Sequence, residues 1–366
     1  MREFFTPNPG SSARRRGPGG AAVLLLAAAS CGGLVVGWSP WSTQPPAAMA
    51  QADRFDASEA RAEATPDAGL RFGEAEKLAK LDGSMRESSG LAASRTRPGR
   101  LWTHGDSGGG PWLMRFDPWH GQPERWAVRG GSHLDWEDMA SFEMGGRAYL
   151  LIADTGDNDR RRKSVALHFV EEPEPALNET TDTTGPVPVL ETRLTMHVTF
   201  ADGSRDCEAV AVDTATSTVW LLSKEINGRG QMFGRSGLYG VALPPIEAWP
   251  DADTTIVGTP AAPLVLDRIA TLDTVMPTAM DVSSDGSVLL VGTYGDGLLF
   301  EREPEVDPDW SMAVAAGPTR VPLPPRRQGE GLCFAADGGA AFLSSEKSEQ
   351  PVWRVPVVGH VHDASR

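Results

Sequence analysis

Glu208-Ala-Val-Ala-Val-Asp213 and Val219-Trp-Leu-Leu-Ser-Lys-Glu225 are two short apolar segments that are bounded by acidic residues and separated by a turn. Both are rich in Val, Leu or Trp, and both are as short as buried β-strands usually are. The pair therefore predicts two neighbouring antiparallel strands, with acidic side chains where the first strand begins and where the second ends.

The same unit recurs along the chain, in the order acid, apolar segment, turn, second apolar segment. The other first segments begin at Glu87, Glu137, Thr278 and Glu330. The other second segments end at Asp106, Asp154, Tyr294 and Glu346. A third apolar segment follows each pair and a more polar fourth follows in most copies. Four strands per repeat are the blade of a β-propeller.

We therefore expect an all-β fold, a five-bladed β-propeller. The last repeat ends after its third strand, while the segment 75–81 stands unpaired before the first repeat. This N-terminal strand is expected to complete the last blade and close the ring, which removes an exposed sheet edge. The wide spacing between Glu137, Glu208 and Thr278 leaves room for a degenerate blade, so six blades are the alternative.

The first 50 residues have the composition of an export signal. Arginines at 14–16 precede an apolar run, and residues 48–50 read Ala-Met-Ala, a pattern that signal peptidase cuts after. The run is too short and interrupted for a stable membrane span; lipidation at Cys31 is a second interpretation. We assign 1–50 to a signal peptide, 51–74 to an N-terminal linker, 75–358 to the propeller domain and 359–366 to a C-terminal tail. The protein is expected to be periplasmic, extracellular or on the cell surface.

The composition is acidic, with a formal net charge of −15. Without residues 1–50 the chain has 30 basic and 48 acidic residues. Such a surface repels nucleic acid and attracts cations. Only Cys207 and Cys333 lie outside the signal, in non-adjacent repeats, so no disulfide framework is expected. Nothing in the pattern resembles an apolar helical seam, and we expect a monomer.

Acidic residues at the strand ends predict a metal site. In a propeller blade the first strand starts, and the second ends, at the same mouth of the central channel. The metal ligands expected there are Glu87, Glu137, Glu208, Glu330, Asp106, Asp154 and Asp157. So many carboxylates need a counter-charge, and Ca²⁺, which prefers oxygen ligands, is the cofactor we expect. The alternative is that these acids cap loops by accepting backbone N–H bonds.

Basic residues border the same positions. Arg160 follows the loop after Asp154, Arg327 precedes Glu330, and His133 precedes Glu137. They are expected to contact a small anionic ligand, because a metal and arginines together bind phosphate or carboxylate groups well. Charge runs of this kind are also common on solvated faces.

Five short motifs resemble one known family. They are Glu-Ser-Ser-Gly-Leu-Ala (87–92), His-Gly-Asp-Ser-Gly (104–108), Asp-Trp-Glu-Asp-Met-Ala (135–140), Ala-Asp-Thr-Gly-Asp-Asn (153–158) and Gln-Gly-Glu-Gly-Leu (328–332). They are similar to motifs of exported bacterial β-propellers of the SdiA-regulated type and their phytase-like relatives, over roughly residues 84–356. The resemblance implies a five-bladed propeller with a calcium site, in a family whose activity is mostly unassigned. Thr278, where the other repeats carry Glu, departs from the pattern.

These observations lead to three hypotheses about function. The first is an exported calcium-binding propeller that acts as a binding or scaffold module, with an anionic ligand or a surface partner at the acidic mouth. The second is a metal-dependent hydrolase of phosphate esters. The third is a purely structural surface protein. The residues do not identify a catalytic group.

Overall fold

The structure is a computed structural model that describes residues 69–106, 109–174, 186–225, 235–250, 262–274, 276–347 and 349–359. The predicted signal peptide, residues 51–68 and residues 360–366 lie outside these ranges. Within them, helix is limited to α1 (Ser311–Ala316) and the 3-10 turns η1 (Gly83–Met85) and η2 (Ile246–Ala248). No helix in the described ranges is long and apolar enough to cross a membrane.

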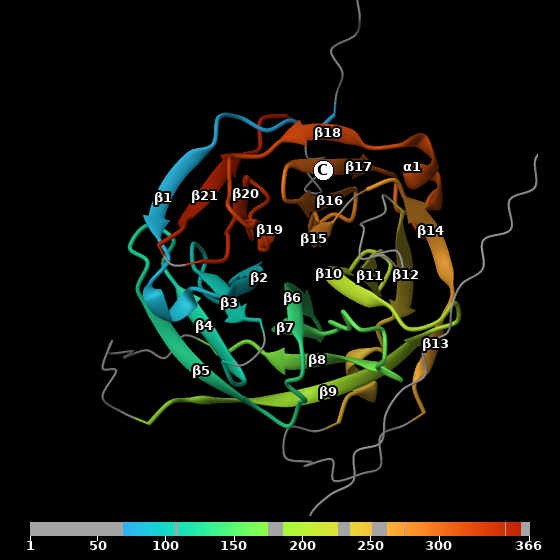
Figure 1. The fold of residues 1–366 in the computed structure, drawn as a ribbon, viewed down its shortest axis with the longest axis horizontal. Coiled ribbons are helices and arrows are strands. Elements are labelled where there is room, and N and C mark those ends of the chain that lie inside the picture. The colour runs from blue at the N-terminus through green and yellow to red at the C-terminus, as the bar shows by residue number, and fades with distance from the viewer. Residues whose placement is uncertain are drawn as a thin grey trace, which may run out of the picture. The chain divides into compact units, whose positions relative to one another are not determined.

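The described strands pair into three four-stranded sheets and one nine-stranded sheet (Figure 1). The nine-stranded sheet contains two four-stranded antiparallel runs joined by one parallel pair of strands, so five four-stranded antiparallel units follow one another along the chain. The first is β2 (Ser88–Ala93), β3 (Leu101–Gly105), β4 (Trp112–Phe116) and β5 (Pro123–Arg129). The second is β6 (Trp136–Met144), β7 (Arg147–Asp154), β8 (Val165–Glu171) and β9 (Val189–Phe200). The third is β10 (Asp206–Asp213), β11 (Thr218–Lys224), β12 (Ser236–Ala242) and β14 (Arg268–Leu272). The fourth is β15 (Pro277–Val282), β16 (Val288–Thr293), β17 (Asp296–Glu301) and β18 (Thr319–Pro322).

The fifth unit combines the two ends of the described chain. It consists of β19 (Leu332–Phe334), β20 (Ala340–Leu343), β21 (Pro351–Pro356) and β1 (Glu76–Lys80). β1 pairs with β21 in antiparallel register, and Phe72 adds a bridge to Val357. The prediction that an N-terminal strand closes the ring is confirmed. Residues before β1 also join the fold, since Leu70 is buried and its N–H donates to Glu301 Oε1 at 2.9 Å.

The inner strands of the units surround a common centre. β2, β6, β10, β15 and β19 contact one another in that order, and β19 returns to β2 (Figure 1). Apolar clusters fill the interfaces between neighbouring units, for example around Trp102 and Trp136 between the first two, and around Trp220 and Trp310 between the third and fourth. Burial of these faces drives the packing of one unit on the next. The fold is an all-β propeller. Each four-stranded unit is called a blade here, and the number of five blades stays a prediction.

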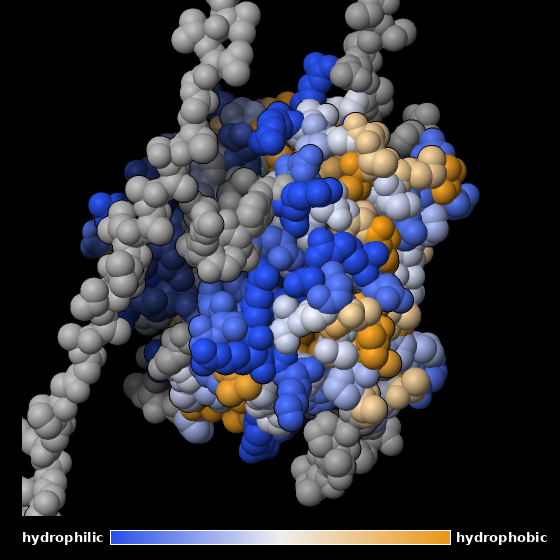
Figure 2. All heavy atoms as spheres, turned by 45° about the vertical axis from the view of Figure 1, so that its right-hand side comes forward, coloured by the Kyte–Doolittle hydropathy of each residue, from blue (hydrophilic) through white to orange (hydrophobic). Residues whose placement is uncertain are grey.

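The outer strand β9 connects three blades. Its middle pairs antiparallel with β8, its first residues pair in parallel with β5, and its last residues pair in parallel with the short strand β13 (Leu264–Leu266). Leu264 and Val265 of β13 are exposed. The face shown in Figure 2 is mostly hydrophilic, with apolar residues in small groups, as is usual for a protein surface.

Three inner strands carry an irregularity at the position where the repeat begins. The register of pairing shifts between Trp136 and Asp138, between Cys207 and Ala209, and between Pro277 and Ala279. The extra residues are Glu137, Glu208 and Thr278. A bulge leaves its extra residue outside the ladder and re-aims the side chain. The first residue of the repeat is thus placed by a backbone feature that the acid pattern alone does not reveal.

Candidate metal centre

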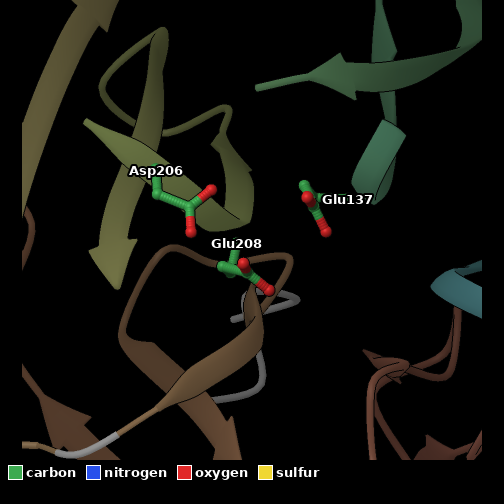
Figure 3. Close-up of side chains that lie close together, drawn as sticks. All are labelled: Glu137, Asp206 and Glu208. Carbon is green, nitrogen blue, oxygen red and sulfur yellow. The ribbon is translucent and has the colours of Figure 1, made fainter. Parts of the chain in front are cut away.

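Three carboxylates converge where the inner strands β6 and β10 begin, at the end of the ring of inner strands that we call the mouth. Glu137 comes from β6, and Asp206 and Glu208 come from β10; one oxygen of each lies within 4.8 Å of the others (Figure 3). All three residues are buried. Asp206 and Glu208 are two residues apart on one strand, and the bulge at Glu208 brings its side chain to the same cluster as that of Asp206.

A fourth carboxylate lies beside Glu137 because the loop after β7 has glycine at position 156. A Cβ on Gly156 would clash with Glu137 Oε1 and with Asp135 Oδ2. Both oxygens therefore lie over the bare backbone of this residue, in a space that any side chain would fill. Burial raises the pKa of the Asp135 carboxyl to about 6, and the charges of Asp106 and Asp206 add to this effect.

Burial also governs the charge state of the two glutamates. It raises the pKa of Glu137 well above its ordinary value, and the neighbouring charges of Glu208 and Asp135 act in the same direction. It raises the pKa of Glu208 to about 8, although the ammonium of Lys224 acts in the opposite direction. Ionised carboxylates in this cluster are therefore costly unless a cation is close by.

The protein supplies part of that positive charge itself. Lys224 Nζ contacts Glu208 Oε1 and lies 3.6 Å from Asp206 Oδ2. Glu330, the acid of the fifth blade, accepts a hydrogen bond from the Tyr294 hydroxyl at 2.7 Å. Tyr294 comes from the fourth blade, the repeat that has Thr278 in place of Glu. The mouth is therefore neither uniformly acidic nor symmetric.

Two of the sequence-predicted ligands have other partners. Asp154 accepts hydrogen bonds from Ser132 Oγ and the Asp135 N–H, and pairs with Arg162 at 2.8 Å. Its burial alone would raise the carboxyl pKa, but these contacts outweigh burial and hold the pKa well below its ordinary value. Asp154 therefore fixes the loop that carries Asp135.

Asp157 caps the loop that follows β7. Its carboxylate accepts the N–H groups of Arg161 and Arg162 at 2.8 and 2.9 Å. Its own N–H donates to Asp206 Oδ1 at 2.7 Å. Asp157 thus orients Asp206 through the backbone, while its carboxylate is engaged in the loop.

The remaining predicted acids lie around the same mouth but outside the cluster. The Asp106 N–H donates to the Glu87 carbonyl at 3.2 Å, and the Glu87 side chain is half exposed beside Arg86. The charges of Asp106 and Glu87 both raise the pKa of buried Glu346, after the larger effect of its burial. The structure therefore brings Glu137 and Glu208 together and leaves Glu87 and Asp106 on the rim.

The predicted ligand-binding residues have different surroundings. Arg160 donates to Glu225 Oε2 at 3.0 Å, and Arg327 is exposed. His133 packs edge-on against Trp136, with ring centres 4.6 Å apart. Its Nε2 is buried without a hydrogen-bond partner among the described residues, and burial lowers its pKa.

Asp135, Asp206 and Lys224 belong to the centre although the repeat pattern does not select them. One signal was available: Asp135-Trp-Glu137 and Asp206-Cys-Glu208 share the spacing Asp-x-Glu at the start of two first strands. The repeated spacing indicates paired carboxylates where a first strand begins, although the bulges at Glu137 and Glu208 interrupt the regular alternation of faces there. No pattern in the sequence identifies Lys224. It lies at the cluster because the pairing of β10 with β11 places it opposite Asp206.

A hard divalent cation fits this set of donors. Asp206 Oδ2 is buried and accepts no hydrogen bond from any described residue, so this oxygen can bind a cation. The space over Gly156 holds oxygens of Glu137 and Asp135 instead of a side chain, and all the donors are carboxylate oxygens, which Ca²⁺ and Mg²⁺ prefer. Glu137, Asp206 and Glu208 would hold the ion, with Asp135 at its edge.

No protein-family model matches the sequence, and no curated protein matches it either. Among solved structures, a glucose dehydrogenase is 11% identical over 77% of this chain and 99% of that chain, with a TM-score of 0.42. A gluconolactonase from Xanthomonas campestris is 12% identical over 79% and 95%, with a TM-score of 0.37. Hydrazine synthase from Kuenenia stuttgartiensis is 10% identical over 75% and 72%, with a TM-score of 0.39. Likenesses at these scores carry no argument about activity.

Proposed function

We propose that this chain is an exported propeller that binds a divalent cation, Ca²⁺, at its channel mouth and uses the site to hold an anionic ligand or surface partner. One observation carries the proposal: three buried carboxylates lie within 4.8 Å of one another, and Asp206 Oδ2 among them has no hydrogen-bond partner among the described residues. The resemblance to SdiA-regulated and phytase-like propellers supports calcium as the cation.

The donor count supports a ligand as well as a metal. Ca²⁺ takes roughly six to eight oxygen ligands, more than Glu137, Asp206, Glu208 and Asp135 supply if each gives one oxygen. The remaining positions fall to water or to an anionic group of a ligand. Binding of this kind needs no group that moves a proton, which suits a binding or scaffold module.

Calorimetry on the purified protein tests the metal. We expect Ca²⁺ binding with a Kd below about 1 mM, and Asp206→Asn and Glu208→Gln should weaken it at least tenfold, because each removes a charge and keeps the shape. Glu346→Gln removes a buried acid from the same mouth but outside the cluster, and it should bind as the wild type does. If all four proteins show no heat of binding with millimolar Ca²⁺, the acids are structural and the proposal is wrong.

A matched pair of glycines locates the site. Gly156→Ala places a methyl group where Glu137 Oε1 and Asp135 Oδ2 lie, whereas Gly295→Ala, after the second strand of the fourth blade, meets no described atom within 4 Å. We expect Gly156→Ala to weaken Ca²⁺ binding at least tenfold and Gly295→Ala to leave it unchanged. Equal affinities in the two variants would place the metal elsewhere.

The alternative function, hydrolysis of phosphate esters, is favoured by Asp135. Its carboxyl has a pKa of about 6 and lies beside the cluster, so it can accept or give a proton near neutral pH. A bound cation would supply polarisation of the phosphoryl oxygen. Turnover from a panel of phosphate and carboxylic esters, present with Ca²⁺ and lost in Asp135→Asn, would establish the enzyme. Absence of turnover from the whole panel would leave the binding function.

A further inference from the structure

The buried ammonium of Lys224 lies among the proposed metal ligands. Lys224 ends β11 and pairs directly with Asp206 of β10. Its Nζ contacts Glu208 Oε1, and the Nζ to Asp206 Oδ2 distance is 3.6 Å. The side chain is only 12% exposed. The sheet ladder, rather than a long flexible connection, therefore fixes this charge at the cluster.

We propose that Lys224 is a resident counter-ion that competes with the divalent cation and so sets the affinity of the site. The inference rests on the proposed metal function. The ammonium occupies one oxygen of Glu208 and faces the oxygen of Asp206 that has no hydrogen-bond partner among the described residues. A cation that takes these two oxygens must displace the ammonium or accept its repulsion at close range.

The charge balance of the cluster supports this competition. When Glu137, Asp206 and Glu208 are ionised they carry three negative charges, and Lys224 neutralises one of them. Two charges remain, which is the charge of one Ca²⁺ or Mg²⁺ ion. The cluster with Lys224 therefore tolerates an empty state, and it still attracts a divalent cation more strongly than a monovalent one. Without the ammonium, the cluster should attract a divalent cation more strongly, and the protein without a bound cation should be less stable.

Lys224→Met tests this by titration with Ca²⁺ alone. We expect at least tenfold tighter binding than in the wild type, a lower melting temperature in chelator, and a larger rise in melting temperature on addition of Ca²⁺. Lys347→Met is the matched control. Lys347 pairs with Glu346 at the same mouth at 3.1 Å, but its side chain is half exposed and it does not contact the cluster. It changes the net charge equally, and its affinity should stay within threefold of the wild type.

Each outcome decides between the two proposals. If the wild type binds Ca²⁺ and Lys224→Met binds it equally or more weakly, the competition is wrong and the metal function stands. If only Lys224→Met binds, the competition is confirmed and the native protein is not a calcium binder. If neither binds, both proposals are wrong. Should Lys224→Met fail to fold, Lys224→Gln loses the same charge and keeps a hydrogen-bond donor, and the same comparison applies to it.

Discussion

Buried carboxylates at the two predicted acidic positions of a blade take on different roles through their immediate neighbours. Asp154 receives several hydrogen bonds and an arginine, and its pKa falls despite its burial. Glu208 has one ammonium and several acidic neighbours, and burial raises its pKa to about 8. Both groups are buried carboxylates, so the difference between their pKa values lies in the donors and charges that surround each oxygen.

The raised pKa values predict how stability depends on pH. Glu208 and Asp135, with pKa values of about 8 and about 6, lie above the unfolded values of 4.5 and 3.8. The folded state therefore binds more protons between these limits. The stability from these groups is full below pH 4 and is lost as pH rises through 6 to 8. Denaturant unfolding in chelator should show the free energy of unfolding of the wild type falling relative to that of Glu208→Gln from about pH 5 to about pH 8. The comparison cancels the buried histidines, whose lowered pKa values act in the opposite direction.

Calcium provides the control for this pH prediction. Saturating Ca²⁺ stabilises the ionised carboxylates, so the fall between about pH 5 and about pH 8 should shrink or reverse. A wild-type stability that rises over the same range relative to Glu208→Gln in chelator would mean that the cluster is already ionised and paired in the empty protein.

At the scale of strands, buried polar contacts join neighbouring blades at positions where no sheet ladder connects them. Asp138 on β6 accepts the Val210 N–H of β10 at 2.9 Å. Asp281 on β15 accepts the Phe334 N–H of β19 at 2.8 Å. Inner strands of separate blades are not partners in one sheet, so these side chains satisfy backbone groups that burial would otherwise leave unpaired.

One such contact joins the third and fourth blades and can be tested directly. Arg302, after β17, pairs with Asp213 at the end of β10, and both side chains are fully buried; the guanidinium also lies 3.8 Å from the Trp310 ring centre. Arg302→Met should lower the free energy of unfolding by about 3–5 kcal/mol, because it leaves Asp213 buried without its counter-charge.

A surface arginine gives the comparison. Arg320 on β18 pairs with Asp296 at 3.5 Å, and both side chains are more than half exposed. Arg320→Met should change stability by less than about 1 kcal/mol. Equal denaturation midpoints for the two variants would show that the buried pair adds nothing beyond an exposed one.

At the scale of the whole molecule, the segment from Leu70 to Leu81 closes the ring. Besides the pairing of β1 with β21, the Ala79 N–H donates to the Pro118 carbonyl of the first blade at 3.0 Å. The segment therefore contacts the last blade and the first. It covers the outer edge of β21, which would otherwise expose unpaired backbone groups.

Deletion of residues 51–82 should open this closure. We expect a fall in melting temperature of about 10 °C or more, and association visible by light scattering, because the edge of β21 becomes available to other chains. A deletion of residues 51–68 keeps Leu70, Phe72 and β1, and it should melt as the protein that begins at residue 51 does. Equal melting temperatures and equal solubility of the two truncations would mean that β1 is dispensable for the ring.

The sequence by itself determined the repeat, the strand class and the closing strand. The repeat and the strand class depend on the local periodicity of apolar residues. The closing strand follows from a last repeat that has three strands and an N-terminal segment that has no partner, and both features are visible in the sequence. The blade start at Glu137 and Glu208 follows from the same pattern. The acidic mouth was also predicted, because the ends of first and second strands must meet on one face of a propeller.

Only the tertiary structure decided which acids form the cluster and which cap loops. The bulges that re-aim Glu137 and Glu208, the glycine space at position 156, and the register that places Lys224 opposite Asp206 all depend on pairing between strands. Asp157 caps a loop instead, because its carboxylate oxygens accept hydrogen bonds from the backbone N–H groups of Arg161 and Arg162. The charge state of the carboxylates at this mouth depends on the distances between residues of different blades, and these distances cannot be inferred from the sequence pattern.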